Sequence, residues 1–115
     1  MKTANVPLVK NGNMSGTINS SPILLDQDVG VYFQAIFTGA PAGNFKLQAS
    51  ADVGIQPAGT AITNWTDYTG SAVSITAAGD YAWDVTTTSA RWMRLVYVPS
   101  SGSGTLNVQV TTKGV

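Results

Sequence analysis

Residues 91–98 read Arg-Trp-Met-Arg-Leu-Val-Tyr-Val, and this stretch decides the fold class. β-branched and aromatic residues dominate it, and such residues favour extended strands. Apolar side chains occupy both the odd and the even positions, with only Arg91 and Arg94 interrupting them. A strand that is apolar on both faces is buried on both. The stretch is therefore typical of a central strand, or of a strand whose outer face is covered by a neighbouring subunit.

Apolar and polar residues alternate with a period of two on either side of that stretch. In residues 31–38, one face would carry Val31, Phe33, Ala35 and Phe37. Such alternation predicts antiparallel strands with one dry and one wet face. The other runs of this kind are residues 44–50, 71–76, 80–86 and 104–112.

Clusters of Gly, Pro, Ser and Asp separate these runs and are interpreted as turns. Residues 39–43, 77–80 and 99–104 each join two predicted strands at hairpin distance. Pro7 and Pro22 interrupt two weaker segments near the N-terminus. Because proline cannot donate to a strand ladder, both segments are expected at sheet edges or strand starts.

About eight short strands without helical periodicity predict an all-β domain. We expect one domain over residues 1–115, an antiparallel two-sheet β-sandwich of the jelly-roll type, with a partly open barrel as the alternative. Residues 1–20 are the weakest part of the pattern, so an extended arm that docks onto a partner is a second interpretation of that segment.

The composition excludes several classes of partner. The chain has 115 residues, is 43% hydrophobic and 10% charged, and carries six basic and six acidic residues, so its formal net charge is zero. A neutral chain with scattered lysines and arginines offers no electrostatic footprint for nucleic acid or an anionic membrane. The N-terminus lacks the apolar run of a signal peptide, and no apolar stretch approaches the length of a membrane span.

The sequence lacks most of the side chains that enzymes use for catalysis, because it has no Cys, no His and no Glu. Nucleophilic triads and zinc sites need these side chains, so we expect a protein that is not an enzyme and has no cofactor. Calcium is the one metal with candidate oxygen ligands, from Asp26, Asp28 and Asp52. No calcium-loop motif accompanies them, and a solvated acidic turn is the better interpretation.

Five residues form the candidate ligand or interface surface: Trp65, Asp67, Tyr68, Arg91 and Arg94. The two aromatic residues follow the longest irregular stretch and stand among polar neighbours, so they could form a platform for a sugar or pack in the core. Each arginine interrupts an apolar strand, and a buried unpaired arginine is costly, so each should face solvent, an aspartate or a partner subunit. Tyr81, Trp83, Trp92 and Tyr97 could join such a platform. The other interpretation is that Phe33, Trp83 and Trp92 fill the core, and alternation with polar neighbours favours it for Trp83.

The second half of the chain resembles a group of known proteins. The residues that carry the resemblance are Phe-Lys-Leu-Gln-Ala-Ser at 45–50, Asn-Trp-Thr-Asp-Tyr at 64–68, Gly-Asp-Tyr-Ala-Trp at 79–83, Ala-Arg-Trp-Met-Arg-Leu-Val-Tyr at 90–97 and Gly-Ser-Gly-Thr-Leu-Asn-Val at 102–108. Together they resemble small β-sandwich proteins of tailed phages and prophages, loosely discoidin-like, over about residues 30–113.

The resemblance implies a non-enzymatic virion component, such as a head decoration protein, a head fibre or a tail accessory domain. It implies other virion proteins as partners, location in the virion, and a homo-oligomer, for which a trimer is the favoured state. Strands and the N-terminal arm would make the contacts. The alternative hypothesis is a carbohydrate-binding or adhesin module that uses Trp65 and Tyr68 on a host glycan.

Overall fold

The protein is seen in a computed structural model that describes residues 3–25, 28–51, 64–85 and 91–114. These residues form strands and connections without a helix, as the alternating pattern predicts. The strands are β1 (Thr3–Asn13), β2 (Ile18–Asn19), β3 (Ile23–Leu24), β4 (Asp28–Ser50), β5 (Thr66–Asp67), β6 (Val73–Ile75), β7 (Gly79–Val85) and β8 (Trp92–Gly114). Every strand pairing is antiparallel.

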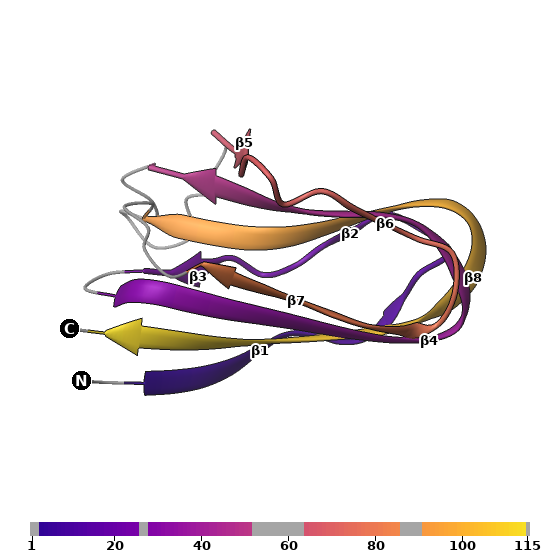
Figure 1. Ribbon diagram of the computed structural model, residues 1–115, viewed down its shortest axis with the longest axis horizontal. Coiled ribbons are helices and arrows are strands. Elements are labelled where there is room, and N and C mark those ends of the chain that lie inside the picture. The colour runs from indigo at the N-terminus through magenta and orange to yellow at the C-terminus, as the bar shows by residue number, and fades with distance from the viewer. Residues whose placement is uncertain (1–2, 26–27, 52–63, 86–90, 115) are drawn as a thin grey trace.

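Two strands of 23 residues each, β4 and β8, form the frame of the molecule. They pair with each other from Asp28 opposite Gly114 to Ser50 opposite Trp92. Midway along, both strands arch over together, so that the paired ribbon folds back on itself and its two halves become two layers (Figure 1). One long two-stranded ribbon therefore supplies the central strands of both layers.

The arch lies at the glycine- and proline-rich segments that the sequence marks as turns. Gly39 in β4 and Gly102 in β8 have φ angles of 89° and 75°, which side chains with a Cβ rarely adopt. The β4–β8 register also shifts between Ala42 and Gly43, and such a bulge bends a strand. The prediction of hairpin turns at residues 39–43 and 99–104 is wrong, because each strand continues through its segment.

The connection at residues 77–80 was also expected to form a hairpin, and it does not. It links β6 to β7, yet β6 pairs with one half of β4 and β7 pairs with the other half. The chain therefore crosses between layers at this point. A turn signal specifies a local change of direction, and the pairing of the flanking strands depends on the whole fold.

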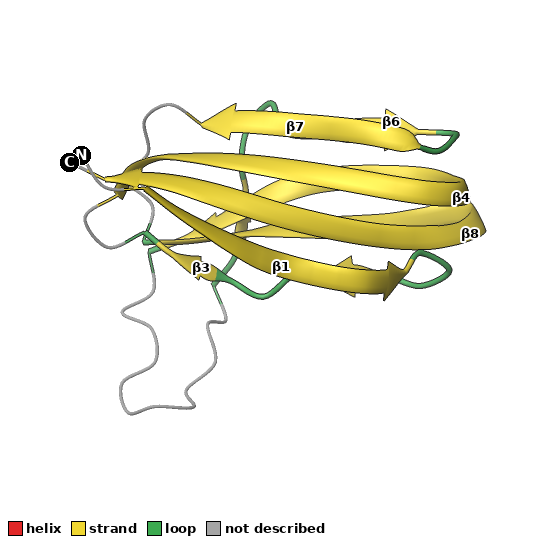
Figure 2. Ribbon diagram, turned by 90° about the horizontal axis from the view of Figure 1, so that it is seen from below, coloured by secondary structure: helices red, strands yellow, loops and turns green. Residues whose placement is uncertain are grey.

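Each layer has four strand positions. One layer has the order β1–β8–β4–β7, and the other has β2 and β3 beside β8, then β4, then β5 and β6 (Figure 2). When the halves of β4 and β8 are counted separately, this is the strand order of a jelly roll. The prediction of an antiparallel two-layer sandwich is confirmed.

The inward faces are those that the alternation predicts. Phe33, Leu47 and Val108 are fully buried, and they belong to one continuous core cluster between the layers. Its aromatic centre is Phe45, whose ring lies 4.8 Å from that of Tyr97 and 5.7 Å from that of Trp83. This cluster lies close to the arch and ties the two layers together.

One core residue is placed differently from the prediction. Trp92 is buried, but it does not belong to the cluster between the layers, whereas its neighbour Met93 does. Successive side chains on a strand point to opposite faces, so Trp92 lies on the outer face of its layer. Its Nε1 has no hydrogen-bond partner among the described residues.

The N-terminal segment is part of the sandwich. β1 pairs with β8 from Thr3 opposite Lys113 to Asn13 opposite Thr105, with two register shifts, after Pro7 and after Val9. This is the edge position that proline predicts. An arm formed from residues 1–20 would have to leave this pairing before it could dock elsewhere.

Candidate functional site

The sandwich has two long sides, where the edge strands of the two layers face each other. On the first side, β1 faces β2 and β3, and apolar side chains fill the space between the layers. Met14 is fully buried there, and Leu8 and Leu25 are nearly so. Met14 also donates its backbone N–H to the carbonyl of Gly104 at 3.0 Å, which fixes the turn after β1. This side is closed.

The second side, where β7 faces the segment around β5 and β6, contains a pocket of about 250 Å³ that opens to solvent. Five consecutive residues, Tyr81 to Val85, form one wall along β7. The other wall consists of Leu47, Tyr68, Gly70 and Ser71. We call this pocket the edge groove. It is slightly smaller than the roughly 300–1,000 Å³ typical of small-molecule sites, and its lining is mixed polar and apolar.

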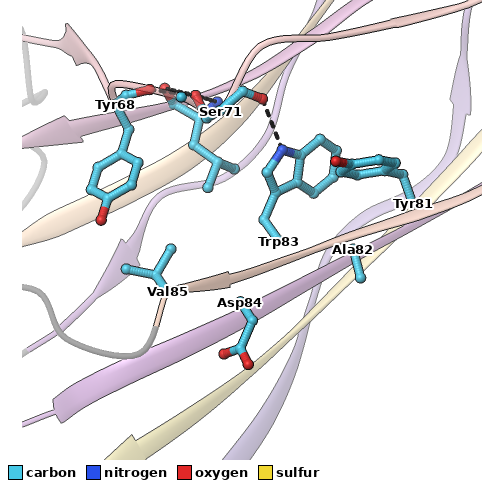
Figure 3. Close-up of a pocket in the computed structure, with 9 residues that line it drawn as sticks. Tyr68, Ser71, Tyr81, Ala82, Trp83, Asp84 and Val85 are labelled. Carbon is cyan, nitrogen blue, oxygen red and sulfur yellow. Dashed lines mark hydrogen bonds between the residues drawn. The ribbon is translucent and has the colours of Figure 1, made fainter.

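Trp83 forms the fixed part of the edge groove. Its side chain is 7% exposed, and its indole Nε1–H donates to the carbonyl of Ser71 at 2.8 Å (Figure 3). The Tyr81 ring lies 4.8 Å from the indole at an angle of 58°, yet Tyr81 remains 43% exposed. The indole is thus held by a hydrogen bond and the Phe45 ring from the opposite layer and by the Tyr81 ring from its own strand.

Ser71 holds the second wall together. Its Oγ accepts the backbone N–H of Leu47 at 2.9 Å and donates to the carbonyl of Tyr68 at 2.6 Å. The backbone N–H of Tyr68 in turn donates to the carbonyl of Leu47 at 2.8 Å. β5 has already ended here and β6 has not begun, so a buried hydroxyl takes the place of strand pairing along β4.

The backbone of β7 is paired on one side only. Its register with β4 runs without a shift from Val85 opposite Val31 to Gly79 opposite Phe37. No other described strand pairs with β7, and Figure 2 shows it at the margin of the molecule. Its side chains divide as the strand period requires: Trp83 and Val85 point between the layers, and Ala82 and Asp84 point away (Figure 3).

A separate polar cluster lies on the outer face of the other layer. Arg94 lies over the ring of Trp65, with its guanidinium carbon 4.4 Å from the ring centroid, and its Nε donates to Oε1 of Gln48 at 2.9 Å. The same glutamine donates from Nε2 to Asp67 at 3.0 Å, and Lys46 forms a salt bridge with Asp67 at 3.1 Å. These five residues form a continuous network, which we call the outer cluster.

The electrostatics of the outer cluster follow from these contacts. The hydrogen bond from Gln48, and then that from Lys46, lowers the pKa of Asp67 below its ordinary value. Partial burial lowers the pKa of Arg94, although an arginine keeps its charge at any physiological pH. The cluster thus contains one charge pair, Lys46 with Asp67, and an arginine held by an amide oxygen and an aromatic ring.

The structure brings together only part of the predicted surface. Trp65, Asp67 and Arg94 meet in the outer cluster, whereas Tyr68 turns into the edge groove and packs against the core. Arg91 is exposed, and its side chain takes no part in either site. The predicted pairing of Trp65 with Tyr68 on one platform is therefore not formed, because β5 ends between them and they face opposite sides of the layer.

Sequence reasoning missed the residues that make the edge groove. Alternation assigned Trp83 to the core, which is correct, but gave no sign that β7 is an edge strand. The only signal in the sequence was the pair of aspartates in 79–85, and the structure alone shows that Tyr81 is exposed and lines an open space.

The possible calcium ligands cannot be compared with a site. Asp26 and Asp52 lie outside the described residues, as does the side chain of Asp28. Within the described part of the chain, no three Asp side chains come together in a group that could hold a metal ion. That part also contains no helix long and apolar enough to cross a membrane.

Comparison with known proteins finds likeness in fold alone. No family model and no curated protein matches the sequence. Among solved structures, the chain is similar to the SPBc2 prophage-derived protein YomS, with a TM-score of 0.59 and 11% identity over 96% of this chain and 93% of that one. It is also similar to PirA, with a TM-score of 0.51 and 12% identity over 96% and 92% of the two chains.

Both matches extend over nearly the whole chain, so the shared feature is the complete sandwich. At such low identity no functional residue can be transferred. The prophage origin of one neighbour agrees with the coarser part of the resemblance seen in the sequence, to small β proteins of phages and prophages.

Proposed function

We propose that this chain is a non-enzymatic structural component of a phage virion that assembles through strand contacts. The observation that carries the proposal is the β7 side of the sandwich, where an edge strand that no described strand pairs on its outer side runs beside the edge groove. A free edge beside a pocket is able to accept a strand of a partner protein, which supports an assembly role. The prophage-derived neighbour and the sequence resemblance support a virion as the place of assembly.

Head decoration, head fibre and tail accessory roles all fit this proposal. Each uses a small rigid domain that attaches to a larger assembly. Association of the chain with copies of itself, with a trimer as the favoured state, belongs to the same proposal, because virion positions are symmetric and closed rings are the usual result.

Particle analysis tests the proposal. Phage particles produced by the strain that encodes this chain are purified on a density gradient, and their proteins are quantified by mass spectrometry. We expect the chain to co-purify at a fixed ratio to the major capsid protein, while an abundant host protein used as a control is removed. A chain that is present in the lysate but absent from purified particles would refute the proposal. Separation of heads from tails then assigns its position.

Carbohydrate binding is the second candidate, and the aromatic lining of the edge groove supports it. Tyr68, Tyr81 and Trp83 offer ring faces on which a sugar could stack. Trp65 would take no part, because its ring is engaged with Arg94 on the other face. A glycan array on the native chain and the two variants tests this candidate. Binding that is lost in Tyr68→Ala and kept in Trp65→Ala would place a glycan in the groove. The absence of any signal with the native chain would exclude glycan binding.

A further inference from the structure

We propose that β7 accepts an extended segment of a different protein as an additional strand, with apolar side chains of that segment in the edge groove and basic side chains opposite Asp80 and Asp84. This inference rests on the proposed function, because an assembling virion would supply the partner. It names the chemistry of that partner: an extended segment in which apolar and basic residues alternate.

The backbone of β7 is suited to this role. Seven residues pair with β4 in unbroken register, and the strand contains no proline and no lysine. Proteins usually protect an exposed edge with proline, lysine or a bulge, because unpaired N–H and C=O groups attract another strand. β1, the opposite edge of the same layer, has Pro7, Lys10 and two register shifts. β1 therefore carries several protective features, whereas β7 carries only the charges of its two aspartates.

The edge groove gives the added strand a place for its side chains. Strand addition draws its affinity from main-chain hydrogen bonds and its specificity from pockets that take alternate side chains. The groove lies beside β7 on the inward face, at the positions of Tyr81, Trp83 and Val85. Its volume of about 250 Å³ suits one or two apolar side chains. The hydrogen bond from Trp83 to Ser71 fixes its shape before a partner arrives.

The outward face of β7 determines the charge of the partner. Asp80 and Asp84 are exposed and four residues apart, so they lie on the same face. Their cross-strand neighbours on β4, Ile36 and Tyr32, are uncharged. Neither aspartate has a hydrogen bond or a salt bridge among the described residues, in contrast to Asp67. A basic side chain on an added strand would pair with each of them.

The same charges argue against a second copy of this chain as the occupant. Two β7 strands paired antiparallel about Ala82 would place Asp80 of one copy opposite Asp84 of the other, twice. Like charges directly opposite each other in an antiparallel pair are destabilising. The open edge is therefore selective: its aspartates disfavour self-pairing and favour a basic strand from another protein.

A titration followed by NMR tests this inference on the whole purified chain. The probe is a blocked nine-residue peptide in which Lys and Leu alternate, and the control peptide has the same composition in two blocks. We expect the alternating peptide to shift the amide resonances of residues 79–85 and 68–71 and to leave those of β1 unchanged. The block peptide should have little effect. Shifts spread over both edges, or equal shifts from both peptides, would overturn the proposal.

Matched variants measure how much the two aspartates contribute to peptide affinity, apart from the groove. Asp80→Asn and Asp84→Asn should each weaken binding of the alternating peptide about two- to fivefold, as expected for exposed cross-strand charge pairs. Asn5→Lys is the control, because it changes the net charge by the same amount on the exposed face of β1. It should change the affinity less than the aspartate variants do. An equal effect of all three would reduce the binding to general charge attraction and refute the proposal.

Replacement of the central Leu of the probe by Ala tests the groove without altering the protein. We expect several-fold weaker binding, because one apolar side chain leaves the pocket. An unchanged affinity would show that the groove is not used. Shifts of the same amides by a neutral oligosaccharide, with none by the peptide, would assign the site to a glycan instead. Absence of the chain from virions would overturn the proposed function and leave a positive peptide titration standing.

Discussion

The two long sides of the sandwich are built from equivalent strands, but one is closed by apolar side chains and the other contains the edge groove. Each is formed by an edge strand of one layer and two short strands of the other, with a chain crossing between the layers. On the β1 side, Met14, Leu8 and Leu25 fill the interior, and Pro7 and two bulges protect the edge. On the β7 side, the edge is bare and the edge groove remains beside Trp83.

This difference indicates that the closed side contributes mainly to stability, whereas the open side keeps a surface for contacts. A chain of 115 residues needs a well-filled core, and the closed side contributes to it. The open side forgoes some of that burial. What it retains lies within β7: an indole fixed by a hydrogen bond, a backbone that no described strand pairs on its outer side, and two aspartates without a partner in the described chain.

The largest expected effect on this comparison is the loss of Trp83. Trp83→Ala should destabilise the protein by about 3–5 kcal/mol, because a nearly buried indole leaves a cavity in a region that already contains a pocket. The hydrogen bond to Ser71 is lost with it. Chemical denaturation measures the effect, with Met14→Ala as the matched variant on the closed side, where about 2–5 kcal/mol is expected.

A denaturation midpoint for Trp83→Ala equal to that of the native chain would show that the indole does not anchor the open side. Tyr81→Ala provides the inner control, because this neighbour is 43% exposed and its removal should cost clearly less. If Tyr81→Ala and Trp83→Ala reduced the free energy of unfolding equally, the distinction between the fixed Trp83 and the exposed Tyr81 would be wrong.

A smaller loss of stability is expected when a buried serine hydroxyl is removed, and each side has one such serine. Ser20 and Ser71 are both buried, and each accepts a backbone N–H of a long strand, from Leu95 and Leu47 respectively, at 2.9 Å. Ser20→Ala and Ser71→Ala should each cost about 1–3 kcal/mol, because a buried N–H would lose its partner.

The two serine variants sharpen the comparison through their effects on the groove. Ser71→Ala should also alter the edge groove, since the hydroxyl holds the carbonyl of Tyr68, whereas Ser20→Ala should leave the groove intact. Amide resonances of residues 68–71 and 79–85 report this difference. Unchanged stability in both variants would mean that water replaces the hydroxyl at each edge.

The alternation of residues was sufficient to predict the strands and their inward faces. In 31–38 and 104–112 the predicted buried positions are the observed ones, because a strand with one dry face leaves a strict record in the sequence. Pro7 likewise predicted an edge. The bend was not predictable in this way, because the glycines and prolines that arch a paired ribbon are the same residues that end a hairpin.

The site was less predictable than the fold for a related reason. Trp65 and Tyr68 are close in sequence, yet they face opposite sides of one layer, while Tyr68 and Trp83 meet across two layers. Sequence proximity indicates neighbours only within one strand face. Pro7 marks β1 as an edge, but β7 contains no proline, so its sequence gives no sign that it lacks a second neighbour.

The smallest expected effect concerns Asp67 beside the open side. Hydrogen bonds from Gln48 and Lys46 lower its pKa in the folded state. A lowered folded-state pKa stabilises the fold above the unfolded-state pKa, and that stabilisation is lost as the pH falls through the folded-state value. Asp67→Asn should therefore reduce the stability slightly at neutral pH and hardly at all in strong acid. The effect should be small and reduced by salt, because the carboxylate is exposed and surface pairs contribute little. Asp84→Asn is the control, since that exposed carboxylate has no partner in the described chain. If both variants showed the same pH dependence, the outer cluster would contribute nothing, and the two aspartates would differ only in what they could bind.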